Sequence, residues 1–144
     1  MKIKQLTVFL ENKVGSLADL TGLLGENDIN IRALSIIETS DSGILRMIVN
    51  DTEKAYNLLR ASGFSVVLTE VIAVEIADTP GGLAKMLSLL KNAGINVEYT
   101  YAFIARNIQN AIVIIRVSDA ESAERVLKEN RITLIERETV DFYW

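Results

Sequence analysis

The sequence predicts an α+β fold in which two similar units of about 70 residues follow one another. Segment 12–31 matches segment 78–97 position by position, and apolar residues recur first at strand spacing and then at helical spacing within each half. Because 49% of the 144 residues are hydrophobic, the chain has enough apolar surface for folded cores. We therefore expect two domains, 1–69 and 70–144.

The duplication is visible in identical residues at equivalent positions. Further along the chain, residues 44–59 align with residues 112–127, after a small change in the spacing between the two copies. No linker rich in Gly, Pro or Ser separates the halves, so we expect the units to be closely coupled. The identical pairs in the first matched segment are Gly15 and Gly81, Leu17 and Leu83, Ala18 and Ala84, Leu23 and Leu89, Leu24 and Leu90, Ile29 and Ile95, and Asn30 and Asn96.

Each half reads as strand, helix, two strands that form a hairpin, helix and strand. The second helix of each unit follows Asp51 or Asp119, whose side chains are suited to cap it. The order βαββαβ is the ferredoxin-like arrangement, in which two helices pack on one face of an antiparallel sheet. The expected strands are 4–11, 29–38, 43–51 and 64–70 in the first unit and 71–76, 95–104, 110–119 and 132–142 in the second.

Composition excludes several classes of function. Fifteen basic and nineteen acidic residues, spread without runs, give a net charge of -4, which predicts no nucleic-acid or anionic lipid partner. The chain shows no secretory signal and no apolar run long enough to cross a membrane, so we expect a cytoplasmic protein. With no cysteine or histidine and no acid/base constellation, we predict no catalytic residues, no metal site, no cofactor and no enzymatic activity.

The stretch "DTPGG" precedes the first helix of the second unit. Asp78 or Thr79 is a natural N-cap, Pro80 sets φ for the helix start, and Gly81 with Gly82 allows close approach of another group. First-turn N–H groups at such a helix start suit a carboxylate or phosphate. A tight turn without a ligand is an equally good interpretation of these residues, and the spacing is not that of a nucleotide-binding P-loop.

The pattern "D-x-P-G-x-L-A" at a helix start, followed by "G-I-N" at the next strand, resembles the ACT domain, a small-molecule regulatory module of amino-acid metabolism. The resemblance covers the whole chain as two tandem copies. It implies a ligand site at an interface between ACT units, where loop N–H groups hold an amino-acid carboxylate and an Asn or Asp side chain holds the amino group. The implied residues are Asn12, Val14, Gly15, Ser16, Leu17 and Asn30 in the first copy and Asp78, Pro80, Gly81, Gly82, Leu83 and Asn96 in the second.

The first copy departs from the family pattern, because "NKVG" lacks the proline and Asn12 replaces the acid. The resemblance therefore allows the two sites to differ in affinity, or only one to be occupied, and it also implies a homodimer. Arg32 lies two positions beyond Asn30 and is equivalent to Glu98 in the second unit. Both could contact a ligand, but we favour their interpretation as ordinary surface charges.

Three aromatic residues alternate along one expected strand. Tyr99, Tyr101 and Phe103 should share one face, where packing against a helix or a neighbouring sheet is favoured over stacking with nucleic-acid bases.

Together these observations predict a non-catalytic protein that binds a free amino acid and modulates a partner enzyme or regulator. The alternative is a ligand-independent regulatory subunit or assembly module for an amino-acid biosynthetic enzyme. A small enzyme using carboxylates or tyrosines is least favoured. The sequence leaves open which amino acid is bound.

Overall fold

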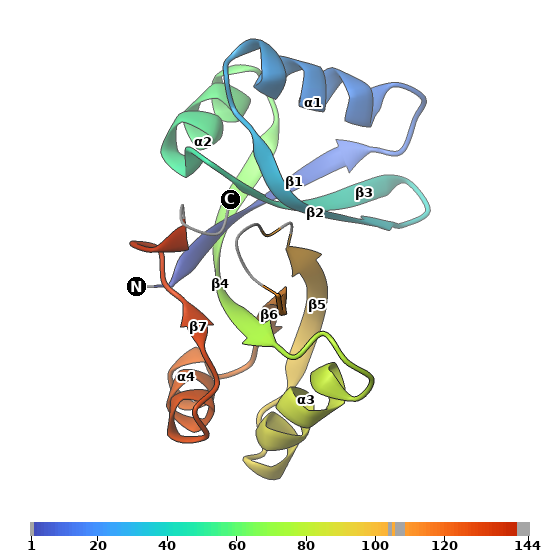
Figure 1. Cartoon of the computed structure of the whole chain (residues 1–144). Coiled ribbons are helices and arrows are strands. Elements are labelled where there is room, and N and C mark those ends of the chain that lie inside the picture. The colour runs from blue at the N-terminus through green and yellow to red at the C-terminus, as the bar shows by residue number, and fades with distance from the viewer. Residues whose placement is uncertain (1, 104, 106–108, 141–144) are drawn as a thin grey trace. The chain divides into compact units, whose positions relative to one another are not determined.

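A computed structural model describes residues 2–103, 105 and 109–140, and Figure 1 shows its elements. The fold is α+β, as predicted, with four helices and seven strands in the described chain. No helix among these residues is both long and apolar enough to cross a membrane. The elements are β1 (Ile3–Glu11), α1 (Ser16–Glu26), β2 (Ile31–Glu38), β3 (Ser42–Val49), α2 (Thr52–Ala61), β4 (Ser65–Ile76), α3 (Gly82–Asn92), β5 (Val97–Phe103), β6 (Ala111–Val117), α4 (Ala120–Glu129) and β7 (Leu134–Ile135).

The chain divides into an N-terminal unit, Lys4–Thr69, and a C-terminal unit that contains the described residues from Glu70 onward together with Lys2 and Ile3. In the N-terminal unit the strand order is β2-β3-β1-β4, with α1 and α2 on one face (Figure 1). This is the predicted ferredoxin-like topology. The core lies between sheet and helices and contains Leu6, Val8, Leu10, Leu20, Leu24, Ile29, Leu45, Met47, Val49, Ala55, Leu59 and Val66.

The C-terminal unit repeats this topology. Its central strands are antiparallel in the order β4-β6-β5, β7 pairs with the other edge of β4, and α3 and α4 cover one face (Figure 1). The strand predicted at 132–142 is shorter than expected. Only Leu134–Ile135 pairs with β4, and the chain then turns, with the Thr139 N–H donating to the Glu136 carbonyl; residues 141–142 lie outside the described part. The core contains Ile72, Val74, Met86, Leu90, Ile95, Ile115, Val117, Ala123 and Leu127.

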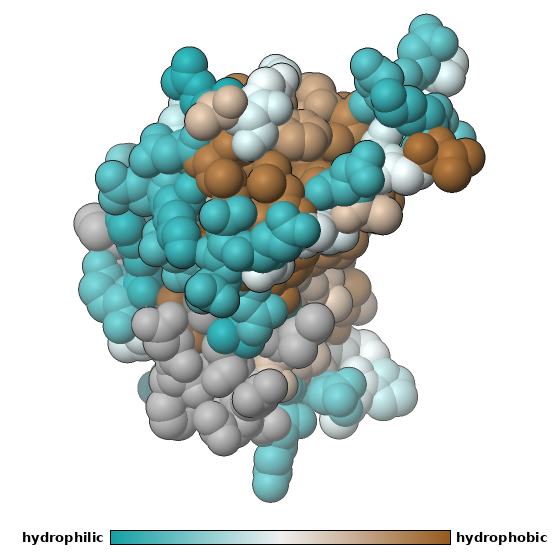
Figure 2. Space-filling view, turned by 90° about the horizontal axis from the view of Figure 1, so that it is seen from above, coloured by the Kyte–Doolittle hydropathy of each residue, from teal (hydrophilic) through white to brown (hydrophobic). Residues whose placement is uncertain are grey.

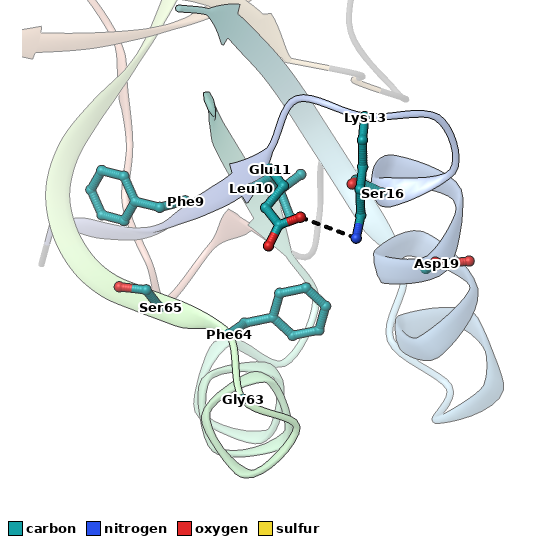
Figure 3. A pocket seen from close by; sticks show the side chains of 9 residues that line it. All are labelled: Phe9, Leu10, Glu11, Lys13, Ser16, Asp19, Gly63, Phe64 and Ser65. Atoms are coloured by element: carbon teal, nitrogen blue, oxygen red, sulfur yellow. Dashed lines mark ion pairs between the residues drawn. The ribbon is translucent and has the colours of Figure 1, made fainter. Parts of the chain in front are cut away.

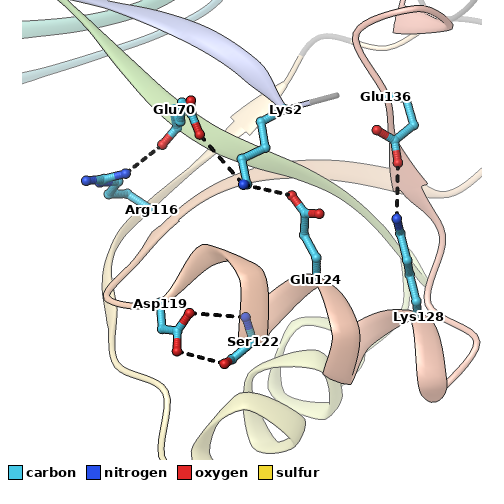
Figure 4. Close-up of polar contacts among 8 residues, drawn as sticks. All are labelled: Lys2, Glu70, Arg116, Asp119, Ser122, Glu124, Lys128 and Glu136. Atoms are coloured by element: carbon cyan, nitrogen blue, oxygen red, sulfur yellow. Dashed lines mark hydrogen bonds and ion pairs between the residues drawn. The ribbon is translucent and has the colours of Figure 1, made fainter.

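Polar contacts attach the first described residues to the C-terminal unit (Figure 4). The Lys2 ammonium lies 3.7 Å from the Glu70 carboxylate and 4.0 Å from that of Glu124. The Arg116 guanidinium donates to the backbone carbonyl of Glu70 at 2.8 Å. Ion pairs at this exposure contribute little energy each, so these contacts mainly fix where the chain begins on this unit.

Two pairs of helices begin in different ways. The carboxylates of Asp51 and Asp119 accept hydrogen bonds from the first-turn N–H groups of α2 and α4, as predicted. Helices α1 and α3 are instead preceded by Gly15 and Gly81, which have φ of 90° and 87° and make no side-chain cap. The expected capping of α3 by Asp78 or Thr79, with Pro80 at the helix start, is therefore wrong.

The reason is a turn that closes before α3 begins. The Gly82 N–H donates to the Thr79 carbonyl at 3.0 Å, so Pro80 lies inside a turn and Gly81 occupies the N-cap position. A Cβ at position 82 would overlap the carbonyl oxygen of Ala77, which confirms that a glycine permits close approach here, to the chain's own backbone.

The aromatic stripe lies on the sheet face that points away from α3 and α4. Tyr101 is opposite Ile114 and Phe103 is opposite Ile112, whereas the neighbouring Ile115 belongs to the helix-side core. The rings of Tyr99 and Tyr101 stack, with centroids 6.4 Å apart and an interplanar angle of 21°. The three residues thus share one face, as predicted, and this face is not the one that the unit's own helices cover.

The overlap at position 82 gives a stability prediction. We expect Gly82→Ala to lower the free energy of unfolding by about 1–3 kcal/mol, because the backbone must move to accept a Cβ. The control is Ser16→Ala at the equivalent position of α1, where a Cβ is already present and the change should stay within about 0.5 kcal/mol. Urea unfolding of both variants measures the difference. Equal stabilities would contradict the overlap.

The cap of α4 gives a pH prediction. Hydrogen bonds from the Ser122 hydroxyl and N–H lower the pKa of Asp119 below its usual value of 3.8 (Figure 4). A folded-state pKa below the unfolded one means that the stabilisation is complete above the usual value and is lost as pH falls through the lowered pKa. Asp119→Asn keeps a cap acceptor but cannot titrate, so its unfolding free energy should fall less steeply in acid. Ser122→Ala should also flatten the slope; curves parallel to wild type for both variants would refute this.

Candidate functional site

The β1–α1 connection leaves backbone donors open at the start of α1. The Gly15 carbonyl accepts from the Asp19 N–H at 2.8 Å, and the Lys13 carbonyl accepts from the Ser16 N–H at 3.3 Å. Among the described residues, no acceptor hydrogen-bonds the N–H groups of Leu17 and Ala18. These two donors point out of the positive end of the helix dipole, which is the arrangement that binds an anion.

A hollow of ≈ 290 Å³ lies beside this helix start, and we call it the loop hollow. Its walls come from the end of β1, the first turn of α1 and the turn end of the β2–β3 hairpin. The hairpin reaches the loop because Gly43 of β3 pairs with Leu10 of β1. The lining residues are Leu10, Glu11, Asn12, Lys13, Ser16, Leu17, Ile36, Glu38 and Gly43.

One side of the loop hollow is acidic. The Asn12 side-chain amide donates to the Glu38 carboxylate at 3.1 Å, and this contact joins the loop to the end of β2. Glu38 is exposed, and a carboxylate that accepts one hydrogen bond can accept others. Apolar side chains also line the hollow, from Leu10, Leu17 and Ile36. The hollow therefore offers donors for an anion, a carboxylate for a cation and apolar surface for a side chain.

A second hollow, of ≈ 370 Å³, lies on the other side of the same loop (Figure 3). Phe64, from the connection between α2 and β4, forms part of its wall, and Asp19 lines it from α1. The Lys13 ammonium lies 3.0 Å from the Glu11 carboxylate, but both side chains are more than half exposed. The loop is therefore accessible from two sides, and this ion pair is weak.

The equivalent connection of the C-terminal unit is tighter. The N–H groups of Leu83 and Ala84 likewise find no acceptor in the described part of the chain. However, Gly82 stands where α1 has Ser16, and the carbonyl of Ala77 occupies the space that a side chain would need. The two copies thus share the open donors but differ in the space in front of them.

The structure brings together only some of the residues that the family resemblance implied. Asn12, Ser16 and Leu17 line the loop hollow, and Gly15 shapes it, whereas Val14 is fully exposed on the loop. Asn30 precedes β2 at the other end of α1, where its N–H donates to the Asn50 side chain at 2.9 Å.

In the second copy, Asp78, Pro80, Gly81, Gly82 and Leu83 lie together at the start of α3. Asn96 lies at the other end of α3, beside a hollow of ≈ 440 Å³, and its N–H donates to the Ser118 hydroxyl at 3.2 Å. A helix of 11 residues is about 16 Å long, so neither asparagine reaches the loop of its own unit.

Sequence reasoning missed the hairpin residues Ile36, Glu38 and Gly43. The signal was present in the predicted topology, because the ferredoxin-like order places the start of the third strand beside the end of the first. The motif "NKVG" covers only the loop before the helix, whereas the acidic wall comes from β2.

No cluster of three or more Asp and Glu side chains able to hold a metal ion occurs among the described residues. Glu11 and Glu38 line the loop hollow together with Lys13, so two carboxylates and one ammonium border the same space.

Comparisons with known proteins agree with this architecture. Residues 1–142 match the ACT domain pair family. The crystal structure of protein BT0572 from Bacteroides thetaiotaomicron superposes with a TM-score of 0.87 and 43% sequence identity, covering 94% of this chain and 92% of that one. A comparison with curated protein sequences finds no match.

More distant structures share the fold. The regulatory subunit of aspartate kinase from Thermus thermophilus, in its ligand-free form, gives a TM-score of 0.61 at 20% identity, covering 89% of this chain and 91% of that one. The corresponding subunit from Thermus flavus gives 0.63 at 20% identity, with 89% and 90% covered. The matched family spans both units and their repeated topology, and the chain therefore belongs to the ACT domain pair family.

Proposed function

We propose that this protein is a non-catalytic sensor that binds a free amino acid and modulates a partner. The observation that carries the proposal is the loop hollow, which is bordered by the start of α1, where two N–H groups are open, and by the Glu38 carboxylate. Membership in the ACT domain pair family supports it, as does the size of the hollow, which is near the lower end for small-molecule sites. We further propose that the sensor's two domains are 1–69 and 70–144.

The polar groups of the hollow suit the two charges of an amino acid. The carboxylate accepts hydrogen bonds from the N–H groups of Leu17 and Ala18, at the positive end of the α1 dipole. The ammonium donates to the Glu38 carboxylate, which Asn12 holds in place. The side chain packs on the apolar wall. In this assignment Asn12 positions the acidic group, and Glu38 takes the contact to the amino group.

Regulation follows from a difference in affinity between two arrangements of the protein. A ligand favours the arrangement in which its site is assembled, by no more than the free energy with which it prefers that arrangement. The Asn12 to Glu38 contact joins the loop to the hairpin, so a ligand that reinforces it stiffens both segments. A partner that contacts the loop or the hairpin then responds to the bound amino acid.

The second candidate is a ligand-independent regulatory subunit that acts by protein contact. It is favoured by exposed apolar side chains on the strands of the N-terminal unit, among them Phe9, Ile36 and Val67, which are 45–47% exposed. Figure 2, which looks onto the helix side of this unit, shows apolar surface open among hydrophilic residues. Such surface is typical of protein contacts.

A ligand screen tests the first proposal. We expect one or a few of the twenty amino acids to stabilise the purified protein, by about 2.7 kcal/mol when the ligand is at 100 times its dissociation constant. Thermal denaturation measures the shift and calorimetry confirms binding. The matched controls are the amide and the N-acetyl derivative of the best ligand, which lack the carboxylate and the ammonium and should bind at least about 10-fold more weakly. A flat screen with both methods would favour the second candidate.

The acidic wall gives a variant test. We expect Glu38→Gln to weaken binding of the identified amino acid by about 10-fold or more, because the amide keeps the size of the side chain but not its charge. Isothermal calorimetry measures the change. Glu53→Gln, on the first turn of α2 and outside the hollow, is the matched control and should bind like wild type. Unchanged affinity of the Glu38→Gln variant would show that the ammonium is held elsewhere.

A further inference from the structure

The apolar side chains of the loop hollow come from three different elements. Leu10 lies near the end of β1, Ile36 lies on β2, and Leu17 lies in the first turn of α1. Leu10 is buried in the core, whereas 46% of Ile36 is exposed, so apolar surface continues from the core into the hollow and opens there to solvent. Covering such surface in a cavity is favourable. The loop hollow therefore offers apolar surface to a ligand group.

Gly43 leaves the space into which Ile36 extends. Ile36 is opposite the core residue Leu45 on β3, so its side chain lies on the helix side of the sheet. A Cβ built at Gly43 would lie 3.4 Å from Cδ1 of Ile36, and Gly43 itself is opposite Leu10 on β1. A larger residue at position 43 would fill this space, and glycine keeps it open.

Ile36 and Glu38 share one face of β2. They lie two positions apart on the strand, which places them about 6–7 Å from each other along its axis. The side chain of an amino acid starts at the carbon that carries the ammonium. An amino acid whose ammonium contacts Glu38 therefore has Ile36 within reach of its side chain.

The charged residues of the loop hollow do not suit a charged ligand side chain. Lys13 is the single cation among the described residues that line it, and its ammonium already lies 3.0 Å from the Glu11 carboxylate (Figure 3). An acidic side chain would meet Glu11 and Glu38, and a basic one would meet Lys13. Like charges in juxtaposition oppose binding. A polar, uncharged side chain would lose hydration against the apolar residues.

Aromatic residues distinguish the two hollows beside the loop. Phe9 and Phe64 line the second hollow, whereas the described residues that line the loop hollow include no aromatic side chain. A ligand ring would find no ring to stack on there. The branched side chains of the loop hollow suit an aliphatic group instead.

The equivalent place in the C-terminal unit lacks this apolar surface. By strand register, Ala102 is equivalent to Ile36 and Ala111 is equivalent to Gly43. The first replacement removes most of the apolar side chain, and the second puts a methyl group where Gly43 leaves space. The apolar surface beside the loop is thus specific to the first copy.

We propose that the loop hollow selects amino acids with an aliphatic side chain, such as leucine, isoleucine or valine, and that Ile36 determines this preference. The inference rests on the proposed function, because it takes the ammonium to be held by Glu38. The ligand side chain packs among Leu10, Leu17 and Ile36, where each buried methylene group strengthens binding about 4-fold.

Nearly isosteric amino acids test the preference. Leucine and asparagine have side chains of similar branched shape, as have valine and threonine, but one member of each pair is polar. We expect leucine and valine to bind at least about 10-fold more tightly than asparagine and threonine, measured by isothermal calorimetry. Phenylalanine, lysine and glutamate complete the panel and should each bind more weakly than leucine.

A pair of neighbouring variants tests the role of Ile36. Ile36→Thr keeps the branched shape but removes apolar surface, and it should weaken leucine binding about 5-fold or more. Ile37→Thr is the matched control, because Ile37 is 41% exposed, points to the opposite face of β2 and does not line the hollow. It should bind leucine like wild type, and Ile36→Leu should retain most of the affinity. Urea unfolding shows that each variant is folded.

The possible outcomes separate this inference from the proposed function. If a polar, charged or aromatic amino acid binds as tightly as leucine, the sensor stands and the aliphatic preference is overturned. If Ile36→Thr and Ile37→Thr change the affinity for leucine equally, Ile36 does not determine it. If none of the amino acids binds, both the inference and the proposed function are overturned.

Discussion

The left-handed glycine at the N-cap of α1 and α3 is the constraint on which the candidate site depends. At φ near 90° the chain turns into the helix without a capping side chain, and the next N–H groups stay open. In α2 and α4, the Asp51 and Asp119 carboxylates each accept from one first-turn N–H, that of Lys54 or Ser122, which is equivalent to the N–H of Ala18 or Ala84. One backbone conformation, repeated at Gly15 and Gly81, therefore leaves this additional donor open in α1 and α3.

The repeat made the fold predictable from sequence, because each element was visible twice. Two independent copies of a strand, helix and hairpin pattern leave little choice of topology, and Asp51 and Asp119 identified the second helices directly. The start of α3 was not predictable in the same way. Asp78 suits an N-cap and Pro80 suits a first helical turn. The structure instead forms a turn, closed by the hydrogen bond from the Gly82 N–H to the Thr79 carbonyl, and the helix begins after it.

The last strand and the acidic wall are two further features that could not be predicted from the sequence. The apolar pattern of 132–142 is compatible with a strand, but pairing with β4 ends after Ile135, where the charged residues Glu136 to Glu138 form a turn. Glu38 was overlooked for a different reason. Its role depends on the register between β1 and β3, which sets the hairpin end beside the loop, and no local motif records that register.

The sequence motif does not predict which of the two copies has the more open pocket. The first copy lacks the family proline, yet it has Ser16, an open loop and a hollow with an acidic wall. The second copy keeps Asp78 and Pro80, but Gly82 brings the Ala77 carbonyl against the helix start. Proline and glycine tighten a turn, and a tighter turn leaves less room for a ligand. The better match to the family pattern is thus not automatically the better pocket.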